Sequence, residues 1–148
     1  HAANRSGRSG THLEDRVIVV DDNPELLGAL AHMLKSEGLR VDTAADGLSA
    51  LKLCRQLRPR VVILDLYMPH MSGLEVLEAL REDPDLSSMY VIMLSGMAGE
   101  RSELASLAPT ADEHLIKPVN ADRLAEAIEK GLARREPRAG LLGRLERG

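Results

Sequence analysis

The sequence has almost no aromatic residues: it contains no Trp, no Phe and only two Tyr among 148 residues. Hydrophobic residues nevertheless make up 44% of the chain, so the core has to be built from aliphatic side chains. The length suits one domain with loose ends and is enough to bury a sizeable core. Surfaces that bind nucleic acids usually offer stacking rings and basic patches. The scarcity of rings therefore argues against such a surface.

Positive charge is also scarce in the main part of the chain. Residues 16–130 contain 12 Lys and Arg against 19 Asp and Glu, whereas residues 131–148 contain 5 Arg against 2 Glu. The formal net charge of the whole chain is −4. An acidic body is the opposite of what contact with DNA or RNA phosphates requires. We therefore expect no direct nucleic-acid binding by this domain.

Cysteine and long apolar runs are nearly absent as well. The single Cys54 excludes an internal disulfide, and its leucine neighbours favour packing as a small hydrophobic side chain. No apolar stretch approaches the roughly 18 residues that a transmembrane helix needs, and no signal peptide is recognisable. These absences predict a cytoplasmic protein that does not enter a membrane.

The two ends differ from the middle in composition. Residues 1–15 are rich in Gly, Ser and Arg and have no hydrophobic periodicity, so we interpret them as a flexible N-terminal extension or linker. Residues 135–148 contain Pro137 and Gly140 and are interpreted as a C-terminal tail or linker. One domain is therefore expected at residues 16–134.

Short apolar runs alternate with helical patterns between these ends. Continuous apolar runs at residues 17–20, 61–64 and 91–94 are typical of parallel strands covered on both faces. The segments 39–44 and 113–116 are alternating or brief, which favours the edges of a sheet. Five strands alternating with five helices predict a doubly wound α/β domain with a five-stranded parallel sheet and helices on both faces.

The helix starts carry clear signals. Asn23 followed by Pro24 predicts an N-cap with proline at the first helical position. Ser72 and Glu75 match a capping box, and Asn120 opens the last helix. These caps fix where the chain leaves each strand-end loop.

Two of the helices are read from their leucines. The second helix is expected to bury the stripe Leu48, Leu51, Cys54 and Leu57. The fourth, at roughly residues 98–108, has the weakest pattern, and its apolar face is marked by Leu104, Leu107 and nearby alanines. A helix with such poor signals is either a moving part of the domain or, more often, only a short or frayed helix.

Residues that can carry chemistry stand where four of the predicted strands end. In strand order these are Asp21 and Asp22, Asp65, Ser95 and Gly96, and Lys117 and Pro118. In a doubly wound sheet all strands point their carboxyl ends to one edge, and ligands bind there where the winding reverses. The strand order 2-1-3-4-5 puts the first and third strands side by side, so the three carboxylates are expected to meet.

Three carboxylates at one place repel one another unless a cation is present. Oxygen donors without His or Cys favour Mg²⁺, with Asp21, Asp22 and Asp65 as candidate ligands. Lys117 adds a fixed positive charge, and Ser95 adds a hydroxyl donor. A single strand-end Asp more often caps the next helix, but four strand ends converging on one chemistry favour a site. The combination predicts a phosphoryl site in which Asp65 is the nucleophile.

Four segments, VIVVDDNP, VVILDLYMPHMSGLEVL, VIMLSG and HLIKPV, resemble the signature blocks of the receiver domain of two-component response regulators. The resemblance covers about residues 16–133 and implies a flavodoxin-like fold. It implies that Asp65 is the phosphoacceptor, that Asp22 binds Mg²⁺ directly and Asp21 mainly through water, and that the backbone carbonyl of Tyr67 is a further ligand. The phosphoryl group would come from a sensor histidine kinase or a histidine phosphotransfer protein.

The resemblance also implies residues for a conformational switch. Ser95, with Gly96 beside it, is expected to bind the phosphoryl group and to turn toward it, and Lys117 to pair with a phosphoryl oxygen. Pro118 resembles the proline whose preceding peptide is usually cis. His114 stands where Tyr or Phe commonly rotates on activation. A conformational role for His114 therefore stays open against that of an edge-strand histidine with no role.

Members of the family are signalling switches, with at most self-catalysed phosphotransfer and autodephosphorylation, so no separate enzyme activity is expected. Dimers through the last two helices occur in the family, which leaves a homodimer open.

Three alternative functions remain. A magnesium-dependent phosphatase of the haloacid dehalogenase type would need a second acid at Tyr67. A flavodoxin would need aromatic rings and a phosphate-binding loop in place of Asp21 and Asp22. A degenerate receiver could act as an interaction module. The cognate kinase and the output cannot be read from the chain.

Overall fold

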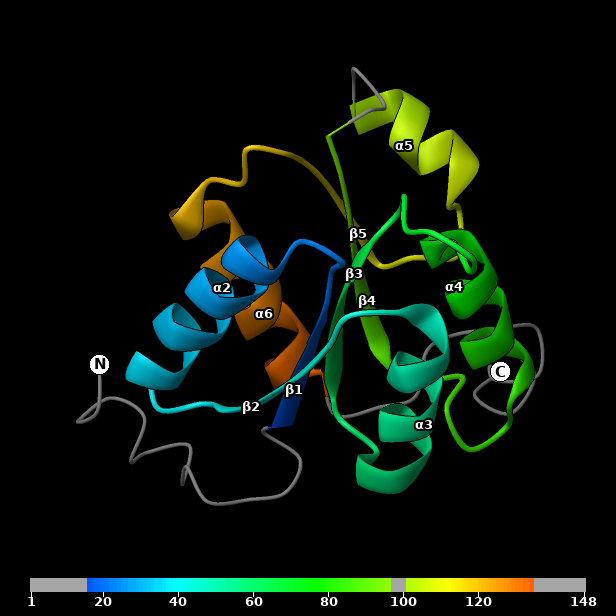
Figure 1. Ribbon diagram of the computed structural model, residues 1–148, viewed down its shortest axis with the longest axis horizontal. Coiled ribbons are helices and arrows are strands. Elements are labelled where there is room, and N and C mark those ends of the chain that lie inside the picture. Colours follow the sequence, from blue (N-terminus) through cyan, green and yellow to red (C-terminus); the bar gives the residue numbers. More distant parts are fainter. Residues whose placement is uncertain (1–15, 97–100, 135–148) are drawn as a thin grey trace, which may run out of the picture.

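The structure is a computed structural model, and it describes residues 16–96 and 101–134. Strands and helices alternate along the chain (Figure 1). The expected extension at residues 1–15 and the expected tail at residues 135–148 lie outside the described residues, so both interpretations stay predictions.

Each predicted strand and helix has a counterpart in the structure. The strands are β1 (Arg16–Val20), β2 (Arg40–Ala44), β3 (Val61–Asp65), β4 (Tyr90–Ser95) and β5 (Glu113–Ile116). The helices are α2 (Pro24–Ser36), α3 (Gly47–Leu57), α4 (Gly73–Glu82), α5 (Arg101–Leu107) and α6 (Ala121–Ala133).

The sheet has five strands in the order β2-β1-β3-β4-β5, and every neighbouring pair is parallel. The predicted strand order is therefore confirmed. The continuous apolar runs form the central strands β1, β3 and β4, and the two weaker segments form the edges. The chain runs from β1 to β2 on one side, crosses back over β1 to β3, and then continues to β4 and β5 on the other side. The direction of winding therefore reverses between β1 and β3.

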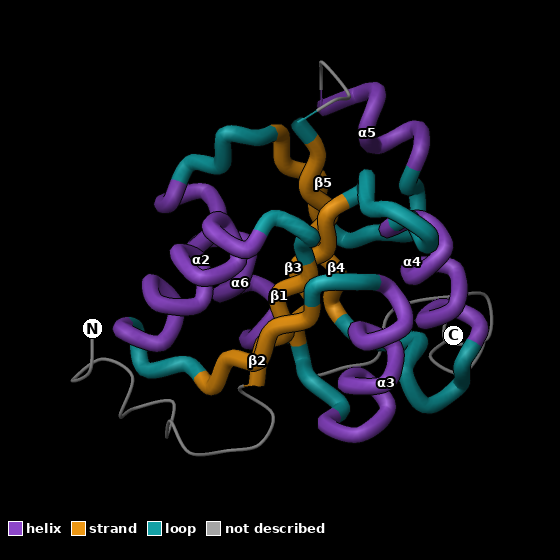
Figure 2. The backbone as a smooth tube through the Cα atoms, in the orientation of Figure 1, coloured by secondary structure: helices purple, strands orange, loops and turns teal. Residues whose placement is uncertain are grey.

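Two layers of helices cover the sheet, with α2 and α6 on one face and α3, α4 and α5 on the other (Figure 1). Side chains alternate between the layers because successive strand residues point to opposite faces. Val17 and Val19 pack in the core cluster with α2 and α6. Ile18 and Val20 pack in the cluster with α3, α4 and α5. Figure 2 shows the strands as a central layer between the helices. Both faces of β1 are thus buried, which explains its unbroken apolar run.

The predicted caps are all present. The side chain of Asn23 accepts hydrogen bonds from the backbone N–H groups of Glu25 and Leu26, at 3.0 and 3.3 Å. Ser72 and Glu75 form both hydrogen bonds of a capping box. Asn120 caps α6. The chain therefore turns from each strand end into the next helix at a position defined by local hydrogen bonds.

Two leucines expected in helix stripes are exposed, and both expectations are wrong. Leu48 is 72% exposed and Leu107 is 46% exposed. The buried face of α3 consists of Gly47, Ala50, Leu51 and Cys54. This set has helical spacing, but it starts at a glycine, whose missing side chain hides it from a hydrophobicity pattern. In α5 the buried positions are Leu104 and Ala108, and Leu107 lies to one side of them.

Cys54 lies on the buried face of α3 and has no exposed surface. Burial raises the pKa of its thiol to about 12, so the sulfur stays protonated at neutral pH. The expectation of a small hydrophobic packing residue is confirmed.

Asp112 joins α4, β4 and the end of α6 at the end of the sheet where the strands begin, opposite the candidate site. Its Oδ2 accepts from Arg81 at 2.9 Å and from the N–H of Val91 at 2.8 Å, and its Oδ1 accepts from Arg134 at 3.0 Å. Arg81 also donates to the carbonyl groups of Ser87, Met89 and Thr110. The side chains of Arg81 and Asp112 are only 10% and 11% exposed, so this ion pair is part of the folded core.

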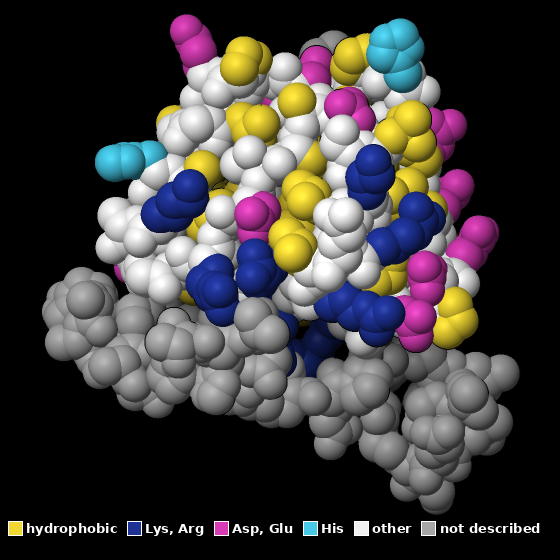
Figure 3. Space-filling view, turned by 60° about the horizontal axis from the view of Figure 1, so that its bottom comes forward, with side chains coloured by type: hydrophobic (Ala, Val, Ile, Leu, Met, Phe, Trp, Pro, Cys, Tyr) yellow, Lys and Arg dark blue, Asp and Glu magenta, His cyan; other side chains and the backbone are white. Residues whose placement is uncertain are grey.

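Charge is separated along the strand direction. Arg16 and Arg40 begin β1 and β2, and Arg60 immediately precedes β3. Lys and Arg side chains gather on the face at which the strands begin (Figure 3). The carboxylates of the candidate site stand at the other end of the strands, about 17 Å away for a strand of five residues. The acidic end is therefore not neutralised by the arginines of the basic end.

Candidate functional site

Two adjacent aspartates follow β1, and they differ in burial. Asp21 is 1% exposed, while Asp22 is exposed to solvent. The N–H of Asp21 donates to the carbonyl of Ala44 at the end of β2, which extends the sheet by one residue. One carboxylate oxygen of Asp21 accepts from the N–H of Asn23 at 2.9 Å. The first acid is thus fixed by the backbone, and the second projects toward the solvent.

Asp65 is the last residue of β3, and its side chain is nearly buried at 5% exposure of the residue. The next residue, Leu66, donates its N–H to the carbonyl of Leu94 at 2.8 Å, so the strand end is held against β4. Burial and the neighbouring charge of Asp21 raise the pKa of Asp65, although Lys117 acts in the opposite direction. The surroundings of Asp65 therefore disfavour its charged form, as expected for a group that a bound cation would stabilise.

Lys117 follows β5 and bridges Asp21, which follows β1, and Asp65, which ends the adjacent strand β3. Its Nζ lies 2.8 Å from Oδ2 of Asp21 and 3.2 Å from Oδ1 of Asp65. Its backbone N–H donates to the carbonyl of Ser95 at 2.9 Å, which fixes the start of the side chain. Burial lowers the pKa of Lys117, but the hydrogen bond to Asp21 and the charge of Asp65 outweigh it, so the pKa is raised. The ammonium group is therefore charged.

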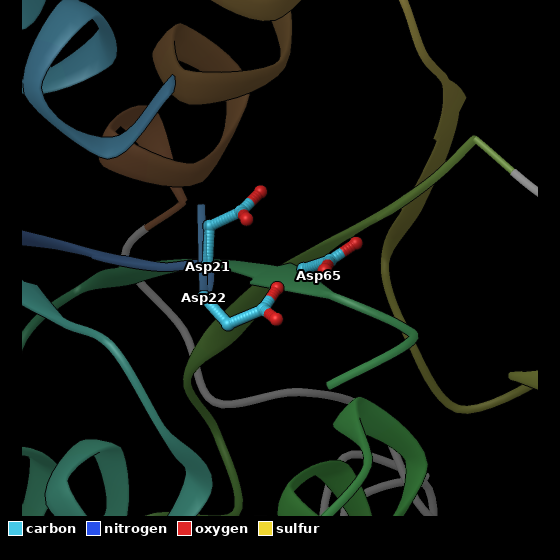
Figure 4. A group of neighbouring side chains, drawn as sticks. All are labelled: Asp21, Asp22 and Asp65. Atoms are coloured by element: carbon cyan, nitrogen blue, oxygen red, sulfur yellow. The ribbon is translucent and has the colours of Figure 1, made fainter. Parts of the chain in front are cut away.

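The three carboxylates form one cluster. Asp21, Asp22 and Asp65 each offer an oxygen, and these oxygens lie within 4.8 Å of one another. Figure 4 shows the three side chains together at the ends of β1 and β3, with the oxygens of Asp22 and Asp65 turned toward the same space. Three carboxylate oxygens without a nitrogen or sulfur ligand form a donor set suited to a hard cation such as Mg²⁺. The residues present therefore suit the metal that the sequence predicts.

Burial singles out this edge of the sheet from the rest of the described chain. Among residues 16–96 and 101–134 whose burial is known, the buried polar side chains are those of Asp21, Asp65 and Ser95. They end or follow β1, β3 and β4, which are adjacent strands. Burying polar groups costs free energy, so their concentration at one place indicates a function other than stability.

The structure brings most of the predicted site residues together and gives the others defined positions. Ser95 is fully buried at the end of β4. Gly96 follows it, and a Cβ built on Gly96 would lie 3.5 Å from Cβ of Lys117. The Lys117–Pro118 peptide bond is cis. The side chain of Tyr67, two residues after Asp65, is 49% exposed. All of these residues lie at the carboxyl ends of the strands, as the sequence predicts.

His114 lies in the middle of β5, opposite Met93 of β4. It is half-buried, and its Nε2 is 2.6 Å from the carbonyl oxygen of Ala108, just after α5. A carbonyl only accepts hydrogen bonds, so this ring nitrogen carries the proton. His114 is thus in contact with the end of α5, which a fully exposed edge histidine would not be.

Sequence reasoning missed two features of the site. The first is the N–H of Asn23 as a partner of Asp21; the two-residue spacing of an Asx turn was a signal for it. The second is the close approach of Gly73 to the end of β3. A Cβ at Gly73 would collide with the carbonyl oxygen of Asp65 and lie 2.9 Å from Cα of Leu66. The capping box located Gly73 but did not reveal this approach, which depends on how the loop closes.

The strand order and the acidic cluster define a doubly wound, flavodoxin-like α/β domain with three carboxylates gathered at the point where the winding reverses. The family model of the response regulator receiver domain matches residues 17–129, and the chain belongs to this family. The family expectation of the sequence analysis is therefore confirmed.

The curated proteins that this chain resembles include regulatory proteins of Mycolicibacterium and Mycobacterium. The DNA-binding response regulator MtrA of Mycolicibacterium smegmatis is 34% identical over 124 residues, which cover 84% of this chain and 53% of MtrA. The probable transcriptional regulatory protein TcrX of Mycobacterium tuberculosis is 38% identical over 119 residues, which cover 80% of this chain and 50% of TcrX. The chain thus spans about half the length of these relatives.

Solved structures with the same fold are receiver domains from different kinds of protein. The response regulator TrrA from Thermotoga maritima, in complex with Mg²⁺ and BeF, is 38% identical with a TM-score of 0.70, over 79% of this chain and 98% of that one. The signal receiver domain of a histidine kinase from Syntrophus aciditrophicus is 28% identical with a TM-score of 0.74, over 86% and 98% of the two chains. Within the residues described for the present chain, no helix is both long and apolar enough to span a membrane.

Proposed function

We propose that this domain is a phosphorylation-activated signalling switch that accepts a phosphoryl group on Asp65. The observation that carries the proposal is the concentration of buried polar side chains at the ends of three adjacent strands, with Lys117 in contact with two of them. A nearly buried carboxylate beside a cation-binding cluster and a fixed ammonium group suits phosphoryl transfer, which depends on positioning and charge stabilisation.

The proposed Mg²⁺ ligands are Asp22, Asp65 and the backbone carbonyl of Tyr67, with Asp21 acting mainly through water. Asp21 already uses one oxygen for the N–H of Asn23 and the other for Lys117. Direct coordination by Asp21 would compete with these bonds, whereas Asp22 is exposed to solvent. When bound, the metal would neutralise the charge that builds up on the phosphoryl oxygens.

The proposed chemical step uses the carboxylate of Asp65 as the nucleophile. One of its oxygens attacks phosphorus, the bond from phosphorus to the donor's imidazole nitrogen breaks, and its electron pair returns to the imidazole, which takes up a proton. The product is an aspartyl phosphate. Lys117, 3.2 Å from Asp65, is placed to pair with a phosphoryl oxygen. The proposed donor is the phosphohistidine of a sensor histidine kinase or a histidine phosphotransfer protein.

The proposed switch runs from the phosphoryl group to α5. Ser95 and Gly96 lead from β4 toward α5, and the hydroxyl of Ser95 is proposed to bind the new phosphoryl group. Pro118 follows Lys117 through a cis peptide bond, and His114 contacts the carbonyl of Ala108, just after α5. Movement of α5 would then change the surface available to a partner.

The partners and the output remain proposals because the chain spans about half of its curated relatives. The DNA binding named for MtrA is a property of that protein as a whole. We propose that the present domain contacts a phosphodonor protein and not nucleic acid. A second copy of the chain is a further proposed partner, through the face that includes α5 and α6.

The test uses acetyl phosphate or beryllofluoride with Mg²⁺ on the purified chain. We expect mass spectrometry to show one added phosphoryl group after treatment with acetyl phosphate. We expect beryllofluoride to shift the NMR signals of the backbone amides around Asp65. Asp65→Asn should abolish both effects, and the exposed control Asp85→Asn should retain them. Normal behaviour of Asp65→Asn would contradict the proposal. Hydrolysis of a free phosphate ester at a steady rate would favour a phosphatase, and binding of a partner unchanged by Asp65→Asn would favour a degenerate receiver.

A further inference from the structure

A close contact joins the start of α3 to the loop that follows Asp65. A Cβ built on Gly47, the first residue of α3, would lie 2.8 Å from Cβ and Cγ of Met71 and 2.9 Å from its Sδ. Such distances are shorter than side chains tolerate, so the contact requires a glycine. Gly47 is buried and Met71 is half-buried. The backbone of α3 therefore forms one wall against which Met71 rests.

The loop in question, residues 66–72, is also held from its other sides. The side chains of Leu66 and Met68 are 2% and 8% exposed and pack in the core cluster beneath α3 and α4. The N–H of Gly73 donates to the carbonyl of Leu66 at 2.8 Å, and the capping box fixes the start of α4. The part of the loop between Met68 and Ser72 has its apolar anchor in Met71, which packs against the same cluster.

Met71 is half-buried and has room to move on its outer side. On its outer side a groove of about 480 Å³ is lined by Asp46, Leu48, His70 and Met71. A methyl group added at Gly47 would push Met71 toward this groove, because the core on the inner side is filled. We expect such a push to move the loop backbone as well, because Cβ of Met71, which is bonded to that backbone, is among the crowded atoms. The positive φ of 70° at His70, beside Met71, shows that the loop backbone is already tightly constrained.

From these contacts we propose that Met71, resting on Gly47, is a positioning residue for the metal site. The inference rests on the proposed function, in which the backbone carbonyl of Tyr67 is a Mg²⁺ ligand. Mg²⁺ demands near-ideal octahedral geometry, so a ligand on a displaced loop binds it poorly. A backbone carbonyl has no rotamers with which to compensate, so its place is set by the anchors of the loop. Met71 acts on the metal through Tyr67 and does not touch it.

The test compares two glycine-to-alanine variants in helices. Gly47→Ala meets Met71, whereas Gly28→Ala in α2 meets nothing within 4 Å and serves as the matched control. The affinity for Mg²⁺ is measured by adding Mg²⁺ to the unphosphorylated chain and following its backbone amide NMR signals. Folding is checked by urea unfolding. We expect Gly47→Ala to bind Mg²⁺ about tenfold more weakly, at the low end of the effects seen when supports of metal ligands are changed. Gly28→Ala should bind like the unsubstituted chain.

Substitutions at Met71 keep the inference falsifiable if Gly47→Ala does not fold. Met71→Ala removes the anchor and should weaken Mg²⁺ binding by a similar factor, while Met71→Leu, of similar volume, should restore most of the affinity. In the Met71→Ala background, Gly47→Ala should cause a smaller further loss, because two of the three crowded atoms are gone. Residues in contact also couple in stability, so the positioning role requires that the coupling appear in the Mg²⁺ affinity and exceed the coupling seen in urea unfolding.

The outcomes separate this inference from the proposed function. If folded Gly47→Ala and Met71→Ala bind Mg²⁺ as tightly as the unsubstituted chain, the positioning role is wrong, although the phosphoacceptor proposal stands. If the unsubstituted chain binds no Mg²⁺, or Asp22→Asn leaves binding unchanged, the proposed metal site itself fails.

Discussion

The ammonium group of Lys117 lies 3.2 Å from the carboxylate of Asp65, although Lys117 follows β5 and Asp65 ends β3, with β4 between these two strands. The same ammonium group lies 2.8 Å from Asp21. One cation thus compensates part of the negative charge of two nearly buried acids. The balance of charge in this cluster leads to two predictions.

The first prediction concerns Lys117→Met in buffer without Mg²⁺. The side chain is only 23% exposed, and its loss leaves Asp21 and Asp65 facing each other without a cation. We expect the free energy of unfolding to fall by about 1–3 kcal/mol. Mg²⁺ should stabilise the variant more than the unsubstituted chain, because it replaces the missing charge. Urea unfolding with and without Mg²⁺ measures both effects.

The control for this prediction is Lys130→Met, whose 68% exposed side chain lies 3.5 Å from Glu113. An exposed pair of this kind contributes about 1 kcal/mol or less. If Lys117→Met were as harmless as Lys130→Met, or gained nothing extra from Mg²⁺, the charge balance described here would be wrong.

The second prediction concerns the pH dependence of Asp65→Asn. Because the pKa of Asp65 is raised in the folded state, the folded chain holds its proton more tightly than the unfolded chain does. The charged carboxylate therefore destabilises the fold at pH values above the raised pKa, and this cost disappears as the pH falls below the ordinary value of 3.8. We expect Asp65→Asn to be more stable than the unsubstituted chain at neutral pH without Mg²⁺, with the difference vanishing in acid.

Thermal unfolding across this pH range measures the difference, with Asp85→Asn as a control, because the side chain of Asp85 is 67% exposed. A stability difference that grew in acid would have the wrong sign and would show that Asp65 is stabilised as a carboxylate.

The third prediction concerns Arg81, which holds Asp112 and three carbonyl groups at the opposite edge of the sheet. Arg81→Met leaves the carboxylate of Asp112, 11% exposed, with less compensation, and removes the donor to the carbonyl groups of Met89 and Thr110. We expect a loss of about 3–5 kcal/mol in the free energy of unfolding, as for other buried pairs that are broken on one side. Arg58→Met, which breaks an exposed pair with Asp85, should cost less than about 1 kcal/mol. Equal effects in urea unfolding would refute the distinction.

The fourth prediction concerns His114→Phe, which keeps a ring in β5 but cannot donate to the carbonyl of Ala108. We expect a loss of about 1 kcal/mol in stability. Amide exchange should become faster at Ala111, whose N–H also donates to Ala108. The exposed histidine of α2 provides the control variant His32→Phe, which should leave exchange unchanged. Nitrogen NMR gives an independent check: a neutral His114 ring protonated at Nδ1 would contradict the hydrogen bond.

Much of the fold could be predicted because it follows from local patterns. Apolar runs of strand length gave the strands, and side-chain caps such as Asn23 and Ser72 gave the helix starts. The helix stripes were less secure. Gly47 contributes to the buried face of α3 without a hydrophobic side chain, so the pattern shifted to Leu48, which is exposed. A glycine that faces a core is invisible to hydrophobic periodicity.

The candidate site divides in the same way. The sequence was sufficient to place Asp21, Asp22, Asp65 and Lys117 at one edge of a parallel sheet, because the direction of parallel strands leaves no other arrangement. Only the tertiary structure decided that Asp21 is buried while its neighbour Asp22 is exposed, that Lys117 reaches both strands, and that Met71 rests on Gly47. Strand direction and alternation are properties of short segments. Burial and contact arise between segments far apart in the chain, and they depend on how side chains of particular volume fill the space between them.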